Sequence, residues 1–118
     1  MIKSPTYFVD IDGTLIRYRT FDKLQLLDPI PIQSVIDLVN KEYDKGAHIV
    51  ITTARPWDLK DFTIGELEQI GVKYHQLVMG IGRGTRYIIN DRDPEFPDVK
   101  RAVGINVNRN KGSLSFII

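Results

Sequence analysis

The sequence contains no cysteine among its 118 residues. This absence excludes disulfide bonds and thiolate metal sites. No apolar run approaches the roughly 18 residues that a membrane-spanning helix needs, and the first residues lack the apolar core of a signal peptide. An excess of one charge is also missing, because 16 basic and 15 acidic side chains leave a formal net charge of +1. The composition therefore gives no general reason to bind nucleic acid or anionic lipid, and we expect a cytoplasmic protein that does not enter the membrane.

The length suits one domain with a single core, which we expect to span residues 1–118. Short apolar runs at residues 7–9 and 48–53, the second with several β-branched residues, predict two strands. Between them, apolar residues recur at helical spacing from Ile32 to Tyr43, and this pattern predicts a helix that ends at Gly46. A second helix is predicted from Thr63 to Gly71, because Thr63 and Glu66 have the spacing of a capping box.

Three further runs resemble strands, at residues 74–79, 86–90 and 102–107. The alternation predicts an α/β, three-layer Rossmann-like fold: a mostly parallel five-stranded sheet with helices on both faces. One connection conflicts with this topology, since residues 80–85 are too few for an ordinary parallel crossover, and an antiparallel hairpin is the alternative. Residues 108–118 form either an extra β-element or a loosely held end.

The most informative motif is Asp10-Ile11-Asp12-Gly13-Thr14-Leu15, at the end of the first predicted strand. Burying a carboxylate there costs several kcal/mol unless something compensates for it. Two carboxylates at the carboxyl end of a strand make sense if they hold a cation and a phosphate, because ligands bind at this edge of open α/β sheets. The alternative is an Asp-rich turn, since Asp and Gly are common in turns.

This hexapeptide resembles the first motif of the haloacid dehalogenase superfamily of phosphotransferases. The resemblance implies an enzyme with the fold of that superfamily, a phosphomonoester hydrolase in which Asp10 attacks phosphorus and becomes an aspartyl-phosphate. Asp12 would act as general acid and then as general base. Gly13 and Thr14 would contact the substrate. The resemblance also implies Mg²⁺ held by the Asp10 side chain, the Asp12 main-chain carbonyl and Asp91.

A second segment, Ile51-Thr52-Thr53-Ala54-Arg55-Pro56, resembles the second motif of the same superfamily. The resemblance assigns Thr53 to the catalytic set, with Ala54 and Arg55 beside the substrate. A hydroxyl and backbone N–H groups at a strand end can stabilise the charge that develops on a transferring phosphoryl group.

The run Tyr87-Ile88-Ile89-Asn90-Asp91-Arg92-Asp93-Pro94 resembles the Asp-Asp-Arg motif of capsule-biosynthesis phosphatases and of the 3′-phosphatase of polynucleotide kinases. Asn90 stands where the first Asp is expected, and Asp91 matches the second and is the expected metal ligand. Asp93 is either a further acid of the site or a turn residue before Pro94.

The lysine of the third motif is missing, and residues 80–86 (Gly-Ile-Gly-Arg-Gly-Thr-Arg) stand in its place. Arg83 is the expected substitute, because a guanidinium group binds phosphate with a fork of donors. Arg86 and Lys60 are the alternatives.

No gap between the motifs has room for a cap domain, so the chain resembles a capless member of the superfamily. Residues 16–30 allow only a short flap, in which Arg17 and Arg19 would meet an anionic leaving group, unless they form a solvated basic loop. An open site would suit a large substrate or a homo-oligomer that covers it. A sugar phosphate or another small phosphometabolite is the expected substrate, followed by nucleotides or nucleic-acid 3′ ends.

Two other classes of protein are alternatives to a phosphatase. A response-regulator receiver domain also clusters acids at strand ends, but its phosphoacceptor follows the third strand and its Lys the fifth, and the chain lacks this arrangement. The second class is a binding or regulatory domain with the same fold and little or no turnover. Asn90 and the missing lysine favour this second class.

Overall fold

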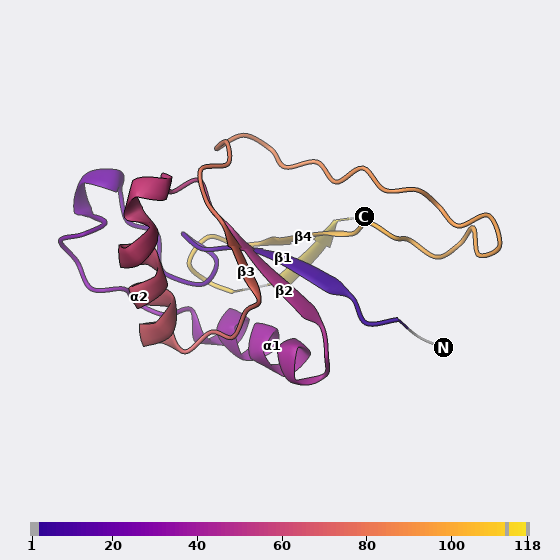
Figure 1. The fold of residues 1–118 in the computed structure, drawn as a ribbon, viewed down its shortest axis with the longest axis horizontal. Helices are drawn as coiled ribbons and strands as arrows, with labels where there is room; N and C mark the ends of the chain where they lie inside the picture. The colour runs from indigo at the N-terminus through magenta and orange to yellow at the C-terminus, as the bar shows by residue number, and fades with distance from the viewer. Residues whose placement is uncertain (1–2, 113, 118) are drawn as a thin grey trace.

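The computed structural model describes residues 3–112 and the backbone of residues 114–117. Its main sheet has three parallel strands in the order β1 (Thr6–Asp10), β2 (His48–Thr52) and β3 (Gln76–Val78) (Figure 1). Asp10 is in register with Thr52, and Thr52 with Val78, so the carboxyl ends of all three strands meet at one edge. This edge borders the hollow that is the candidate functional site.

Two α-helices connect the strands. Helix α1 (Gln33–Asp44) lies where the apolar spacing predicted it, and Gly46, with φ of +98°, follows its end. Helix α2 (Lys60–Ile70) ends at Gly71 as predicted, but it begins before Thr63 and directly follows the 3₁₀ turn η2 (Trp57–Leu59). The capping box is therefore wrong. Neither helix of the described residues is long and apolar enough to cross a membrane.

Both helices cover the same face of the sheet. Alternate residues of β1 and β2 point toward one cluster of buried side chains, which also holds Val35 and Ile36 of α1 and Leu67 of α2. Both crossovers step across the sheet in the same direction, and right-handed crossovers then place their helices on the same side. Among the described residues, the prediction of helices on both faces is thus wrong, and the main body has two layers.

The predicted five-stranded sheet is also wrong, although the small α/β fold is as expected. Residues 86–90 form no strand. Strand β4 (Gly104–Val107) pairs antiparallel with β5 (Leu114–Ile117) in a separate two-stranded sheet. Residues 80–85 are too short for a parallel crossover, and none is needed because no strand follows them directly. The conflict seen in the sequence therefore does not arise. The C-terminal residues 114–117 supply an extra β-element.

Residues 81–103, which we call the arm, extend away from the main body as a long excursion without helix or strand (Figure 1). The arm exposes large apolar side chains, including Tyr87 at 84% and Ile89 at 97%. The radius of gyration is 15.1 Å, whereas a compact chain of this length has about 13.5 Å. The accessible surface is 8368 Å², against about 6,500 Å² for an ordinary monomer of this mass. The arm thus leaves apolar surface that the described residues do not cover.

Candidate functional site

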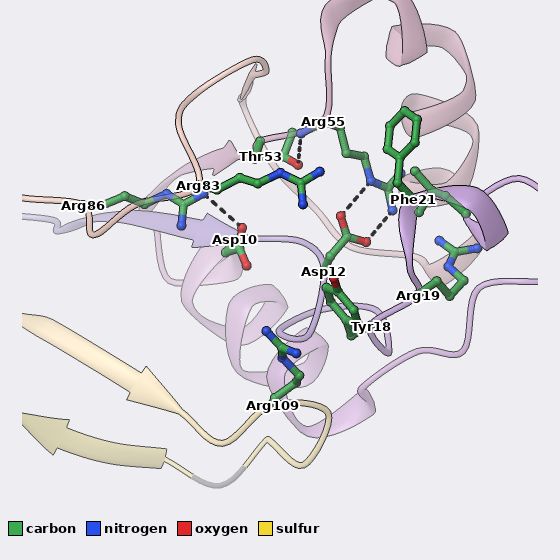
Figure 2. Close-up of a pocket in the computed structure, with 12 residues that line it drawn as sticks. Asp10, Asp12, Tyr18, Arg19, Phe21, Thr53, Arg55, Arg83, Arg86 and Arg109 are labelled. Atoms are coloured by element: carbon green, nitrogen blue, oxygen red, sulfur yellow. Dashed lines mark hydrogen bonds and ion pairs between the residues drawn. The ribbon is translucent and has the colours of Figure 1, made fainter.

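A hollow of about 230 Å³ lies at the carboxyl edge of the main sheet. Asp10 and Asp12 line it from the end of β1, and Thr53 lines it from the end of β2. Ala54 and Arg55, the flap (residues 16–30), the arm and the turn between β4 and β5 supply the rest of its wall (Figure 2). The structure therefore brings together the two aspartates and the threonine that the sequence assigns to catalysis.

Asp10 ends β1 with its side chain 35% exposed toward the hollow. Its Oδ1 lies 3.6 Å from Nη2 of Arg86, and its Oδ2 accepts a 3.4 Å hydrogen bond from the Thr14 hydroxyl. Burial raises the pKa of the Asp10 carboxyl, Arg86 lowers it, and the neighbouring charge of Asp12 raises it again. The net result is a pKa above the usual range, so this carboxylate is less well solvated than an ordinary one.

Asp12 is held by a fork of donors. Nε of Arg55 donates to Asp12 Oδ2 at 3.0 Å, and Nη2 of Arg55 donates to Oδ1 at 2.8 Å. The Arg55 side chain is only 2% exposed, whereas that of Asp12 is 22% exposed. A bidentate guanidinium fixes both the position and the plane of a carboxylate. Arg55 therefore orients Asp12 in the hollow.

Behind Asp12, Arg19, Arg55 and Glu66 form a buried group that we call the Arg–Glu cluster. Nη1 of Arg55 lies 3.0 Å from Glu66 Oε1, and Arg19 donates to both oxygens of Glu66 at 2.9 and 2.7 Å. Burial alone would lower the pKa of the Arg55 guanidinium, but its contacts with Asp12 and Glu66 raise it above its usual value. The cluster ties the flap to helix α2.

Three arginines were predicted to contact the substrate. Arg19 and Arg55 line the hollow, and their guanidinium groups pair with Glu66 and Asp12, because buried charges need partners. Arg17 is exposed and lies outside the hollow. Thr63 and Glu66 belong to the same network: the Thr63 hydroxyl accepts a hydrogen bond from Nη1 of Arg55 at 3.2 Å.

Thr53 is almost fully buried beside Ala54 at the wall of the hollow. Its Oγ1 accepts a 3.1 Å hydrogen bond from the backbone N–H of Arg55. Its own backbone N–H donates to Val78 O, and its carbonyl accepts from Ile81, which links the end of β2 to β3 and to the start of the arm. The hydroxyl hydrogen of Thr53 can therefore be directed at a ligand in the hollow.

Two arginines of the arm stand where a lysine is missing from the sequence. Arg83 and Arg86 both line the hollow, and Figure 2 shows their side chains reaching over Asp10. Arg86 forms the ion pair with Asp10, whereas Lys60 is exposed at the start of α2 and lies outside the hollow. Of the three cations considered from the sequence, Arg86 is thus the best placed beside Asp10.

The turn between β4 and β5 holds the loop that follows β1. Asn110, at φ of +65°, donates its backbone N–H to the carbonyl of Gly13 at 2.9 Å and accepts at its Oδ1 from Tyr18 N at 2.6 Å. The guanidinium of Arg109 lies 4.2 Å from the centre of the Tyr18 ring. Gly13 has φ of +87°, and a Cβ there would lie 3.2 Å from Arg109 Cγ, so both conformation and space require glycine.

Sequence reasoning missed Arg109, Tyr18 and Phe21, which all line this hollow. The available signal was the turn-rich segment Asn108-Arg109-Asn110-Lys111-Gly112 after a strand-like run. It indicated a turn, but it did not indicate which distant loop the turn contacts.

Asp91, the expected third metal ligand, lies elsewhere. It borders a separate hollow with Asn90 and pairs with Arg101 at 2.9 Å. The arm carries these residues away from Asp10, and among the described residues no three His, Asp or Glu side chains are grouped as a metal site. Oδ1 of Asp93 accepts from the backbone N–H of Glu95 at 2.9 Å, so Asp93 acts as a turn residue.

Comparison with known proteins yields one informative match. No family model matches the chain, and no curated protein does. The crystal structure of an MCSG target from Vibrio cholerae aligns with a TM-score of 0.52 and 26% sequence identity, over 81% of this chain and 89% of that chain. This likeness supports a small α/β fold, and the description of that target names no activity.

Proposed function

We propose that this protein is a phosphomonoester hydrolase of the haloacid dehalogenase type, acting on a sugar phosphate or another small phosphometabolite. The observation that carries the proposal is the convergence of Asp10, Asp12 and Thr53 on one hollow that arginines surround. A carboxylate beside a guanidinium, with a second carboxylate held one residue away, supplies a nucleophile, a phosphate-binding cation and a proton carrier in one place.

In the proposed first step, a carboxylate oxygen of Asp10 forms a bond to phosphorus while the bond from phosphorus to the leaving oxygen breaks. Arg86 and the Thr53 hydroxyl would stabilise the charge on the transferring group. Asp12 would give a proton to the leaving oxygen. Arg55 occupies one acceptor site on each Asp12 oxygen, and each oxygen has a second site that can carry the proton.

In the second step, water attacks the phosphorus of the aspartyl-phosphate and Asp12 takes its proton. Inorganic phosphate leaves and the carboxylate of Asp10 is restored. Because Arg55 holds Asp12 in a fixed plane, the same oxygen can serve both steps without a change of side-chain position.

The donors in the hollow fit Mg²⁺ only in part. Asp10 offers a hard carboxylate oxygen, and Mg²⁺ is often bound by one or two carboxylates together with waters and substrate phosphate. The Asp12 side chain is engaged by Arg55, and Asp91 lies in another hollow. We propose that Asp10 and the main-chain carbonyl of Asp12 hold the ion. When bound, it would offset the repulsion between carboxylate and phosphate.

We expect the purified protein to hydrolyse p-nitrophenyl phosphate with Mg²⁺ present and to slow by about 100-fold in excess EDTA, because the ion supplies several kcal/mol of transition-state stabilisation. Release of p-nitrophenol, followed by its absorbance, measures both rates. Added Mg²⁺ should restore the activity. A rate that EDTA does not change would contradict the metal requirement, and the absence of turnover on a broad panel of phosphate esters would contradict the hydrolase.

The second candidate function is a phosphate-binding or regulatory domain without turnover. The position of Asp91 and the engagement of both Asp12 oxygens by Arg55 favour it. Saturable binding of phosphate esters without release of inorganic phosphate would support this function over the first. Among hydrolases, the open site also keeps nucleotides and nucleic-acid 3′ ends as alternative substrates.

We further propose that a second copy of the chain covers the arm. The surface in excess of an ordinary monomer is about 1,900 Å² on one chain, which exceeds the roughly 800 Å² that each partner contributes to a standard protein interface. Ile89 and Tyr87 would lie in that interface. We expect light scattering after gel filtration to give at least a dimer, and Ile89→Lys to shift it to the monomer.

Leu26→Lys is the matched control, because Leu26 is also exposed, at 79%, but lies on the flap. This variant should keep the assembly. A wild-type protein that is monomeric at every concentration would contradict the proposal.

A further inference from the structure

We propose that this site prefers phosphate monoesters whose leaving group carries a second anionic group, a carboxylate or another phosphate, and that Arg109 binds this group. The inference rests on the proposed hydrolysis and extends it to the class of substrate. It comes from the balance of charge in the hollow and from the way the β4–β5 turn presents Arg109.

The charges in and behind the hollow fall into two sets. Arg19 and Arg55 are matched by Glu66 and Asp12, and this set is neutral. The other set has three arginines, at 83, 86 and 109, against the single carboxylate of Asp10. The hollow therefore has an excess of two positive charges before any ligand or metal ion enters.

A phosphate monoester dianion offsets this excess, but Mg²⁺ would restore it. A hollow with surplus positive charge favours a ligand with more negative charge than one phosphate supplies. A leaving group with its own anion meets that requirement, whereas a neutral sugar or alcohol does not.

The arginines approach from two sides. Figure 2 shows Arg83 and Arg86 entering from the arm above Asp10, while Arg109 rises from the β4–β5 turn on the opposite side. Arg86 contacts the proposed nucleophile, so the arm is placed to bind the phosphoryl group. Arg109 is then the cation left for the remainder of the substrate.

Arg109 is held in place without an acidic partner. Its guanidinium stacks on the Tyr18 ring, and the two hydrogen bonds of Asn110 fix the turn against Gly13 and Tyr18. Among the described residues, no carboxylate forms an ion pair with Arg109. A guanidinium that stacks on a ring keeps its fork of donors for a planar or tetrahedral anion, and its fixed position reduces the entropy lost on binding.

The test compares phenyl phosphate with 4-carboxyphenyl phosphate, two esters that differ by one anionic group on the leaving phenol. We expect wild-type kcat/KM to be about 10-fold higher for the carboxylated ester, as one charge-assisted hydrogen bond predicts. In Arg109→Gln this ratio should fall to near one. Lys111→Gln is the matched control, because Lys111 is an exposed cation two residues away that lies outside the hollow, and it should keep the wild-type ratio.

Calorimetric binding of the same two esters to wild type and to Arg109→Gln separates this inference from the proposed function. If neither ester is hydrolysed but the carboxylated ester binds more tightly and only through Arg109, the hydrolase fails and the anion site remains. The anion site would be overturned if wild type and Arg109→Gln had the same preference for the carboxylated ester over phenyl phosphate. This preference is measured by affinity, and also by kcat/KM where the esters are hydrolysed. Equal affinity of both esters for the wild-type protein would overturn it as well.

Discussion

Asp10→Asn should reduce the hydrolysis of p-nitrophenyl phosphate by about 10³-fold or more, because an amide cannot form the acyl-phosphate and loss of a covalent nucleophile is among the most damaging changes to an enzyme. Initial rates at saturating Mg²⁺ measure the loss. Asp98→Asn removes an exposed carboxylate of the arm, outside the hollow, and should leave the rate unchanged. Activity of Asp10→Asn within 10-fold of wild type would overturn the covalent mechanism.

The same variant should be at least as stable as the wild type. The pKa of Asp10 is raised in the folded protein, so the folded state binds this proton more tightly than the unfolded chain does. The stability contributed by Asp10 is therefore present at low pH and is lost as the pH rises through the raised pKa. At pH 7 the charged carboxylate is a net cost, and an amide removes it.

Urea denaturation at several pH values checks this expectation. The free energy of unfolding of Asp10→Asn should exceed that of the wild type at pH 7, and the difference should shrink as the pH falls below the Asp10 pKa. An inactive variant that is also less stable at pH 7 would show that its lost activity reports damage to the fold.

Glu66→Gln is expected to lower the free energy of unfolding by about 3–5 kcal/mol. Glu66 is the shared partner of two buried arginines, and its side chain is 5% exposed. Removing its negative charge leaves two buried guanidinium groups, those of Arg19 and Arg55, without enough negative charge nearby. Water cannot solvate them in this buried position. Urea denaturation followed by circular dichroism at pH 7 measures the change.

Glu68→Gln is the matched control, because Glu68 lies on the same helix and is exposed. Its free energy of unfolding should stay within about 0.5 kcal/mol of wild type. Equal stability of the two variants would mean that Arg19 and Arg55 are solvated and that the Arg–Glu cluster does not hold the flap.

Local patterns in the sequence predicted much of the main body. The runs at β1 and β2 and the apolar spacing of α1 depend on neighbouring residues, so they can be recognised before folding. The meeting of Asp10 with Thr53 was also predictable, because the carboxyl ends of parallel strands lie at one edge of a sheet.

The errors share one physical origin, since each depends on a distant contact. Thr63 and Glu66 have capping-box spacing, yet Glu66 pairs with Arg19, 47 residues earlier in the chain. Residues 86–90 have the composition of a strand, but a strand also needs a neighbour, and the arm provides none among the described residues. The place of Asp91 follows from the same segment, which carries it away from Asp10.

The hydrogen bonds that Asn110 forms with Gly13 and Tyr18 also affect when the candidate site is completed during synthesis. Once the chain up to Val78 has left the ribosome, the three strands and both aspartates are available, whereas the arm's arginines and Arg109 have not yet emerged. The nascent sheet can therefore form while its carboxyl edge is still short of positive charge. The pocket receives its full set of cations only after residue 110 emerges, so a chain stalled before that point would lack the arginine to which we assign the second anion.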